Sequence, residues 1–251
     1  MKLLNNLKYY FSLAFLIIKN IKKISQDHGF FLINLKNGTV FRIRNLMDLW
    51  TLGETYLNRD YENHGARLGL RWTIIDIGAA FGDFSVFAAQ QSPDNHVIAV
   101  EPLPSSLYLL KQNINNNHLK NISIFSGALS STQTKIPILE NKTNYGHSLI
   151  SSAATKLVDS ISLTELFTRY HISRCHLIKC DCEGSEYDIF SGLPAATFKK
   201  INRIVMEYHL FTDGSSQKFE KLQIVLKKNN FKLKLSPNPI HSNLGFLYAF
   251  K

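Results

Sequence analysis

The chain has 251 residues, of which 45% are hydrophobic and 19% are charged. This balance predicts one large packed domain, with or without a small appendage, and excludes a disordered chain. The 13 glycines and 7 prolines exclude a collagenous or low-complexity protein. The 29 basic and 19 acidic residues give a net charge of +10, which favours anionic partners. The charge alone does not choose among nucleic acid, an acidic membrane and an anionic cofactor.

The cysteines indicate a cellular compartment. There are three of them, Cys175, Cys180 and Cys182, crowded into one short segment. An odd number at this spacing does not fit a disulfide framework. We therefore expect a reducing compartment and a cytoplasmic protein.

The first 24 residues carry five lysines and no acidic residue. Their apolar positions recur at the spacing of one helical face. The densest apolar run, residues 9–18, is too short for a membrane span, which needs about 20 residues. No small-residue cleavage site follows it, as a signal peptide would require. Two interpretations stay open: a helix packed on the domain, or an interfacial helix at the anionic inner face of a membrane, with an uncleaved export signal least favoured.

The segment up to residue 70 is predicted to be an accessory region. Residues 29–35 and 39–44 alternate in polarity around Asn37-Gly38, a dipeptide that is typical of a β-hairpin. Residues 47–58 have the pattern of a helix. Residues 1–70 therefore predict an amphipathic helix, a hairpin and a second helix.

From residue 71 to residue 251 the pattern is that of an α/β domain. Strands are expected at residues 73–77, 96–100, 121–125, 175–180, 201–208, 231–235 and 245–250, and helices at residues 82–91, 104–117, 162–170, 186–191 and 217–229. Strands that alternate with helices predict a mostly parallel, doubly wound sheet of Rossmann-like type, covered on both faces. The last two strands are expected to form a hairpin.

A short glycine loop, residues 76–82, follows the first of these strands. Ligands of open α/β sheets bind at the carboxyl ends of the strands. Gly78 allows a close backbone approach, and Gly82 allows the next helix to approach the sheet. The loop lacks the second glycine of the dinucleotide fingerprint, so by itself it fits a plain tight turn equally well.

The next strand ends in Glu101-Pro102, which strengthens the case for a nucleoside site. A carboxylate at this place can accept hydrogen bonds from both ribose hydroxyls. A solvated strand-end acid is the alternative. No triphosphate-binding loop is present. S-adenosylmethionine fits best because it has no phosphate group. A phosphate would lie unfavourably beside the carboxylate of Asp76.

A second acidic segment runs from Lys179 to Glu186 and contains Asp181 and Glu183. Three carboxylates this close together repel one another and need compensation, which favours a functional site. The alternative is a charged first helical turn, and we assign Glu186 to it. We expect the flanking Cys180 and Cys182 to be small buried apolar side chains rather than zinc ligands.

The following strand ends in Glu207-Tyr208-His209. Glu207 and His209 point the same way by alternation. This strand should neighbour the one that ends near Asp181, so Asp181, Glu207 and His209 are expected to face one pocket. His209 is a candidate general base because imidazole titrates near neutral pH.

From residue 73 to residue 208 the chain resembles the FkbM-type class I S-adenosylmethionine-dependent methyltransferases. The resemblance is carried by residues 75–79, 99–102, 127–130, 178–186 and 205–209. It implies a seven-stranded sheet whose last strand is antiparallel, and transfer of a methyl group to oxygen. It also implies that the cofactor-binding residues are Asp76, Gly78, Ala79, Phe81, Gly82, Glu101, Pro102, Gly127, Ala128 and Asp181. One departure stands out: Ala80 occupies a position where the family usually has Asn.

The resemblance and the strand ends together give a set of catalytic candidates: Asp181, His209, Glu207, Lys179 and Glu183. We expect Asp181 or His209 to take the proton of an acceptor hydroxyl. A divalent cation held by Asp181, Glu207 and His209 is the less favoured alternative, because the ligand spacing is not diagnostic.

We expect the acceptor to be a glycan or another small molecule, as in polysaccharide modification. A nucleic-acid methyltransferase is the first alternative, but the proline-aromatic pair expected for a flipped base is absent after Asp181, and acids at the pocket mouth repel phosphates. A non-catalytic binding module on the same fold is the second alternative. Peripheral contact with an anionic membrane through residues 1–24 also stays open.

Overall fold

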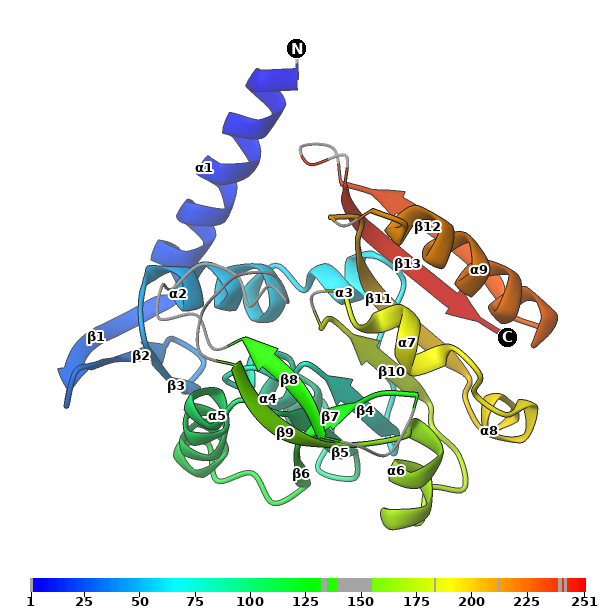
Figure 1. Cartoon of the computed structure of the whole chain (residues 1–251). Coiled ribbons are helices and arrows are strands. Elements are labelled where there is room, and N and C mark those ends of the chain that lie inside the picture. Colours follow the sequence, from blue (N-terminus) through cyan, green and yellow to red (C-terminus); the bar gives the residue numbers. More distant parts are fainter. Residues whose placement is uncertain are drawn as a thin grey trace.

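The computed structural model describes residues 2–131, 135–139, 155–182, 184–211, 213–238, 241 and 243–251. Its centre is a seven-stranded sheet in the order β12-β13-β11-β10-β4-β5-β6 (Figure 1). The strands are β4 (Thr73–Ile77), β5 (His96–Glu101), β6 (Ile122–Ser126), β10 (Leu177–Cys180), β11 (Arg203–His209), β12 (Lys232–Pro237) and β13 (Leu244–Phe250). Neighbours from β11 to β6 pair in parallel, and β13 is antiparallel to both β11 and β12. The predicted doubly wound sheet with an antiparallel last strand is confirmed.

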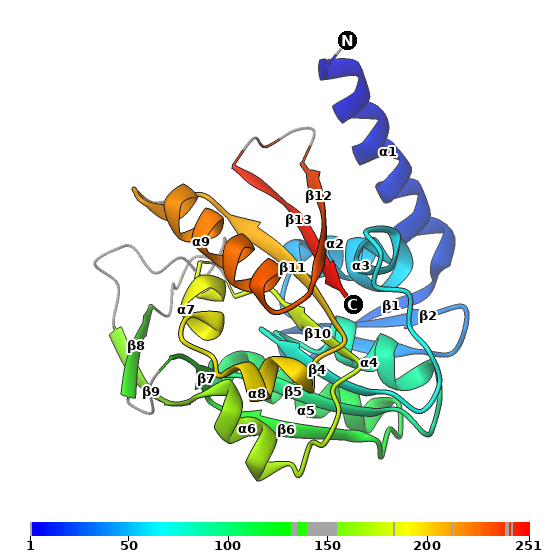
Figure 2. The same ribbon diagram turned by 90° about the vertical axis from the view of Figure 1, so that its right-hand side faces the viewer.

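Alternation along the strands gives the sheet two apolar faces. Ile75 and Ile77 point into one hydrophobic cluster, and Ile74 points into the other. The helices of this domain are α4 (Asp83–Gln90), α5 (Pro104–Asn116), α6 (Leu163–Arg169), α7 (Glu186–Phe190), α8 (Ala195–Lys199) and α9 (Ser215–Lys228). Side chains of α6 to α9 fill the first cluster, whereas α4 and α5 cover the opposite face (Figure 2). Both faces are buried at β4, β5 and β10, which is why these strands are mostly apolar.

The accessory region has more elements than the predicted helix, hairpin and second helix. It comprises α1 (Lys2–Asn20), β1 (Ile21–Asp27), β2 (Phe30–Leu35), β3 (Val40–Ile43), α2 (Leu46–Leu52), the π-helix η1 (Gly53–Leu57) and α3 (Asp60–Asn63). The predicted hairpin is confirmed as β2 and β3. The helical interpretation of residues 21–24 was wrong, because these residues form an edge strand paired with β2. The side-chain amide of Asn20 donates to the carbonyl of Leu16 at the end of the helix.

A small third sheet follows β6, in a stretch that showed no regular pattern in the sequence. It consists of β7 (Ala128–Leu129), β8 (Lys135–Leu139) and β9 (Thr155–Ile161), in the order β7-β9-β8. The backbone N–H of Gly127, just before β7, donates to the carbonyl of Glu101 at 3.1 Å. This bond ties the small sheet to the end of β5.

The accessory region shares a hydrophobic cluster with the central sheet. The ring of Phe41 contacts those of Tyr56 and Phe81 edge to face. The side chain of Asn113 in α5 accepts the backbone N–H of Arg42 at 2.6 Å and donates to its carbonyl. The accessory region thus packs on the face that α4 and α5 cover. The division of the chain at residue 70 stays a prediction.

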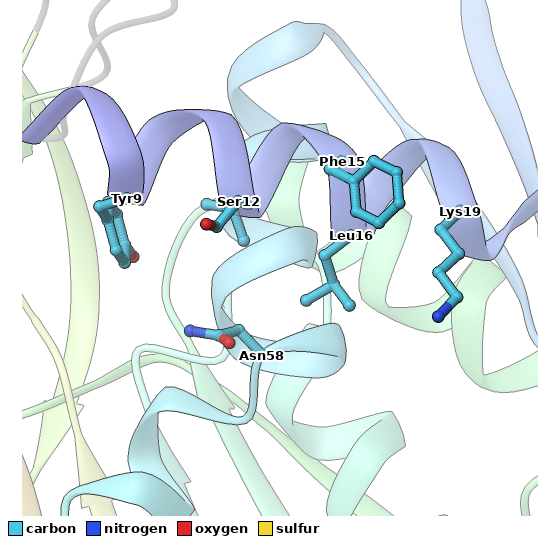
Figure 3. Close-up of a pocket in the computed structure, with 7 residues that line it drawn as sticks. Tyr9, Ser12, Phe15, Leu16, Lys19 and Asn58 are labelled. Carbon is cyan, nitrogen blue, oxygen red and sulfur yellow. The ribbon is translucent and has the colours of Figure 1, made fainter.

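Helix α1 projects away from the body of the molecule (Figures 1 and 2). It rests on η1 through Leu13 and Ile17, and a Cβ at Gly53 would overlap the Ile17 side chain. Beside this contact lies a hollow of about 290 Å³ between α1 and Asn58 (Figure 3). No helix within the described ranges combines the length and the apolar character that crossing a bilayer requires.

The hydroxyl of Tyr9 in α1 donates to Glu54 at 3.1 Å and lies 3.4 Å from a carboxylate oxygen of Asp60. Burial raises the pKa of the Glu54 carboxyl from 4.5 to about 7. The pKa of Asp60 is also raised by burial. The docking of α1 therefore rests partly on carboxyl groups that retain protons more readily than those of the unfolded chain.

The Glu54 carboxyl predicts a pH-dependent stability. Because its folded-state pKa lies above the unfolded value, the free energy of unfolding should fall as the pH rises from about 4.5 to about 7. In Glu54→Gln, which cannot titrate, this fall should be smaller by about 1–2 kcal/mol in denaturant titrations across that interval. The exposed Glu220→Gln is the matched control. Equal pH profiles for the wild type and Glu54→Gln would contradict the assignment.

Candidate functional site

The glycine loop lies between β4 and α4 at the carboxyl ends of the strands. Gly78 has a φ of +76°, and a Cβ there would overlap the backbone carbonyl oxygen of Asp181. The N–H groups of Gly78 and Ala79 both donate to the carbonyl of Val100. The loop is thus pressed against the ends of β5 and β10, and only glycine fits at Gly78.

Ala80 also lies in the left-handed region, with a φ of +47°. This conformation disfavours a side chain with a Cβ, and Asn tolerates it better than most residues. The geometry gives a physical reason for the Asn expected from the resemblance. The backbone N–H of Ala80 still makes a contact with the site, since it donates to a carboxylate oxygen of Glu101 at 2.8 Å.

Glu101 ends β5 with a carboxyl group that is almost wholly buried. One of its oxygens accepts from Ala80, and the other accepts from the N–H of Leu103, just beyond Pro102. Burial raises the pKa of Glu101 to about 7, although the two backbone donors oppose this shift. Each carboxylate oxygen has two lone pairs, so the group retains capacity to accept hydroxyl donors.

Lys179 and Asp76 form a buried ion pair between neighbouring strands. They are paired residues of β10 and β4, and the ammonium lies 3.2 Å from Oδ1 of Asp76. The same ammonium donates to the carbonyl of Gly78 at 2.8 Å, and Oδ2 of Asp76 accepts from the hydroxyl of Ser85. Lys179 therefore holds the glycine loop in place. This contact indicates a positioning role for Lys179, which the sequence predicted as a catalytic candidate.

Asp181 follows β10, and its side chain is 26% exposed. One carboxylate oxygen accepts from the hydroxyl of Tyr61 at 2.9 Å. Burial raises the pKa of Tyr61 well above its ordinary value, and the charges of Asp181 and Glu207 add to this shift. Tyr61 comes from α3 in the accessory region, and its place in this site was not predicted. Its position 120 residues before Asp181 left no local signal.

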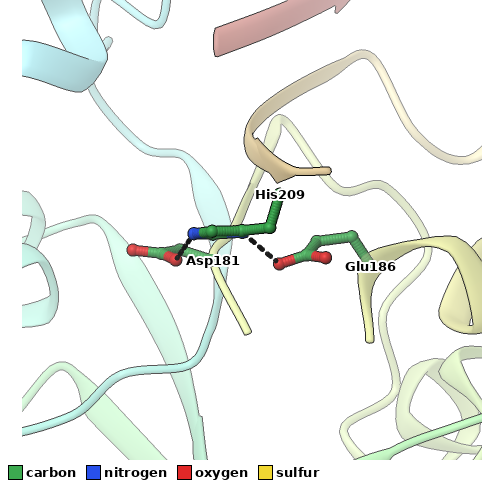
Figure 4. Close-up of side chains that lie close together, drawn as sticks. All are labelled: Asp181, Glu186 and His209. Atoms are coloured by element: carbon green, nitrogen blue, oxygen red, sulfur yellow. Dashed lines mark hydrogen bonds and ion pairs between the residues drawn. The ribbon is translucent and has the colours of Figure 1, made fainter. Parts of the chain in front are cut away.

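His209 lies between two carboxylates (Figure 4). Its Nε2 is 4.0 Å from an oxygen of Asp181, and its Nδ1 is 3.1 Å from Oε1 of Glu186. The sequence assigned Glu186 to a charged helical turn. It does lie in the first turn of α7, but it is fully buried and accepts the N–H groups of Cys182 and Gly184. That assignment therefore missed the contact of Glu186 with His209.

The other predicted residues fall into three groups. Glu207 points to the same side as His209 and contributes to the electrostatic environment of Tyr61, but the described His and carboxylate side chains that cluster tightly are Asp181, Glu186 and His209. Phe81 and Ala79 are buried in hydrophobic clusters, so only their backbone can face a ligand. Glu183 lies outside the described residues.

Gly127 and Ala128 lie beside another hollow. It has a volume of about 380 Å³, and its lining includes Ser126, Asp159 and Arg169. A Cβ at Gly127 would lie 2.7 Å from the carbonyl oxygen of Asp159. This hollow therefore adjoins two of the residues that the resemblance assigns to cofactor binding.

The buried Lys179–Asp76 pair predicts a strong loss of stability when one partner is removed. Lys179→Met should lower the free energy of unfolding by about 3–5 kcal/mol, since it leaves a buried carboxylate without its cation. Adding Asp76→Asn should recover part of that loss in denaturant titrations. Lys199→Met, at an exposed lysine, serves as the control. A double variant no more stable than Lys179→Met would contradict the pairing.

Comparisons with known proteins give distant relatives. The AMB antimetabolite synthetase AmbE of Pseudomonas aeruginosa is 23% identical over 227 residues, covering 72% of this chain and 10% of that protein. Methyltransferase sdnD of Sordaria araneosa is 23% identical, covering 53% of this chain and 65% of that protein. The chain thus spans less than two thirds of the length of these relatives.

Solved structures and a family model agree with the fold. Methyltransferase FkbM of Methylobacillus flagellatus matches with a TM-score of 0.52 and 14% identity, over 82% of this chain and 54% of that one. TYW2 of M. jannaschii, in complex with AdoMet, matches with a TM-score of 0.51 and 14% identity, over 91% and 87%. The model of the methyltransferase FkbM domain matches residues 76–233, more than half of the chain. The chain therefore belongs to the FkbM methyltransferase family.

Proposed function

We propose that the protein is an S-adenosylmethionine-dependent O-methyltransferase that acts on a hydroxyl of a sugar, a glycan or a related small molecule. The observation that carries the proposal is the meeting of Gly78, Glu101 and Asp181 at the ends of three adjacent strands, β4, β5 and β10. Ligands of such sheets bind at this edge. Membership of the FkbM family supports the same reaction class.

The residues present fit the cofactor chemically. Glu101 offers carboxylate oxygens to two ribose hydroxyls, and among the described residues it forms no ion pair that would compete for them. Oδ1 of Asp76 is buried and accepts no hydrogen bond from any described residue, although Lys179 lies nearby. Gly78 and Gly82 would hold the methionine end, with Gly127 and Ala128 near the adenine. When bound, S-adenosylmethionine supplies a methyl group activated by a positively charged sulfonium.

The protein must orient the acceptor hydroxyl and take its proton. The carboxylate of Glu186 favours the tautomer of His209 with a proton on Nδ1. Nε2 of His209 then faces the carboxylate of Asp181 across 4.0 Å. A hydroxyl group can hydrogen-bond to both from one position, so we assign proton acceptance to His209 or Asp181. Glu186 and Tyr61 are positioning residues for them.

The same geometry favours a metal-free route. The ring of His209 presents a different nitrogen to each carboxylate, Nδ1 to Glu186 and Nε2 to Asp181. One cation cannot bind both ring nitrogens. Glu186 is also already held by two backbone N–H groups. A cation on Asp181 and Nε2, with Glu186 behind the ring, is the alternative. Loss of activity with a chelator, restored by magnesium or manganese, would support it.

The charge of the site supports a neutral acceptor. Asp181 and Glu186 place carboxylates around His209, and carboxylates repel the phosphates of a nucleic acid. A neutral hydroxyl acceptor is compatible with them. Incubation with methyl-labelled S-adenosylmethionine and panels of glycans, small alcohols and RNA tests this by intact mass. Label in RNA alone would overturn the acceptor class, and no cofactor binding by calorimetry would overturn the enzyme proposal.

Asp181→Asn should separate binding from turnover. The change keeps the shape of the side chain and its contact with Tyr61 but removes the charge. We expect cofactor affinity to stay within about threefold, and turnover of the labelled acceptor to fall by about 10²–10⁴-fold, the usual range for lost acid–base catalysis. The exposed Asp188→Asn is the control. Unchanged turnover in Asp181→Asn would refute its role.

Glu186→Gln should alter the tautomer of His209. The neutral amide is a weaker acceptor than a carboxylate, so the proton on Nδ1 loses its preferred partner. Nitrogen-15 chemical shifts of the ring should then report less of the Nδ1-protonated form, and turnover should fall while the affinity for the cofactor is kept. A tautomer ratio equal to that of the wild type would contradict the positioning role.

A further inference from the structure

We propose that the outer face of α1 binds the surface of an anionic lipid membrane. The face is defined by Leu7, Phe11, Phe15 and Ile18, which follow one another at intervals of four, four and three residues and so form one stripe. Phe11 and Ile18 are each 72% exposed, and Phe15 is 67% exposed. Large apolar side chains at this exposure, grouped in one stripe, mark an interaction site.

The stripe is distinct from the face by which α1 packs on the protein. Leu13 and Ile17, on the other side of the helix, are buried against η1. The ring of Tyr10 contacts Trp50 of α2 at 5.5 Å between centroids. The helix α1 therefore contacts η1 and α2 through side chains that do not belong to the stripe. Packing against the described part of the chain therefore does not account for the apolar character of the outer residues.

The charge around the stripe selects an anionic partner. Lys8 and Lys19 lie seven residues before and four residues after Phe15, which places both along one edge of the stripe. Both are exposed, and Phe15 and Lys19 lie one turn apart on α1 (Figure 3). The exposed Lys22 and Lys23 follow in β1, and the first acidic residue of the chain is Asp27. An apolar stripe edged by lysines is typical of a helix lying in the plane of an anionic interface.

A second copy of the chain is a weaker candidate for this face. A symmetric pair of α1 helices would bring two identical stripes together, each with the same lysines and no acidic residue. Like charges would then face one another across the contact. A bilayer accepts the apolar stripe and supplies the opposite charge. From Leu7 to Ile18 the stripe is about 17 Å long, which lets it lie flat in the headgroup region.

The docked helix is linked to the candidate active site. Tyr9 of α1 reaches Asp60, and the neighbouring Tyr61 donates to Asp181. Membrane binding itself does not depend on the proposed methyltransferase activity, so the two proposals fail separately.

Flotation of the full chain with lipid vesicles tests the surface. We expect binding to vesicles of phosphatidylcholine with phosphatidylglycerol, weak binding to phosphatidylcholine alone, and a loss of binding at high salt. The variant Phe11→Ser/Phe15→Ser/Ile18→Ser should bind at least about tenfold more weakly. The control Ile224→Ser/Leu235→Ser, at two exposed apolar residues of α9 and β12, should bind like the wild type.

Separate lysine variants test how much charge contributes to vesicle binding. Lys8→Gln/Lys19→Gln should weaken binding by about fivefold for each lysine removed. Lys227→Gln/Lys228→Gln, with the same loss of charge on α9, should have little effect. Circular dichroism and cofactor binding check that each variant is folded. Three results would overturn the proposal: no flotation of the wild type, equal flotation with neutral vesicles, or a dimer in sedimentation that the stripe variant dissociates.

Discussion

The buried pair of Lys179 and Asp76 is the interaction on which the arrangement of the site depends. It joins β10 to β4 in the middle of the sheet, and the same ammonium holds the carbonyl of Gly78. Charge buried this deeply is stable only when it is paired and hydrogen-bonded. Here the hydroxyl of Ser85 and the loop carbonyl provide those bonds. The glycine loop therefore takes its position from the strands beneath it.

From that position the loop brings three chain segments together. Its N–H groups bond to the end of β5, and Gly78 lies against the backbone of Asp181. Such contacts leave no room for a side chain at Gly78. The site is thus built mostly from backbone and strand ends, which are rigid, with Asp181 and His209 projecting from them. A preorganised arrangement of this kind suits a reaction that requires alignment.

The accessory region contributes to the candidate active site and also covers one face of the sheet. Its Tyr61 bonds to Asp181 and contacts the rings of Phe84 and Phe246. Through Tyr9, Glu54 and Asp60, the projecting helix α1 is joined to the same segment. A helix with an exposed apolar face and a candidate catalytic carboxylate are therefore connected by a short series of side-chain contacts.

The sequence by itself determined the alternation of strands and helices in the central sheet, the loop at Gly78 and the strand-end acids Glu101 and Asp181. These features leave local patterns in the sequence. Apolar residues recur at the period of a strand or a helix, and turn residues mark where each strand or helix ends. Only the tertiary structure decided that Ile21–Asp27 is a strand, that the buried Glu186 contacts His209, and that Tyr61 reaches Asp181. These three features depend on which segments meet in space: the pairing of an edge strand, the burial of a charge and a contact across 120 residues. The composition or periodicity of one segment does not contain this information.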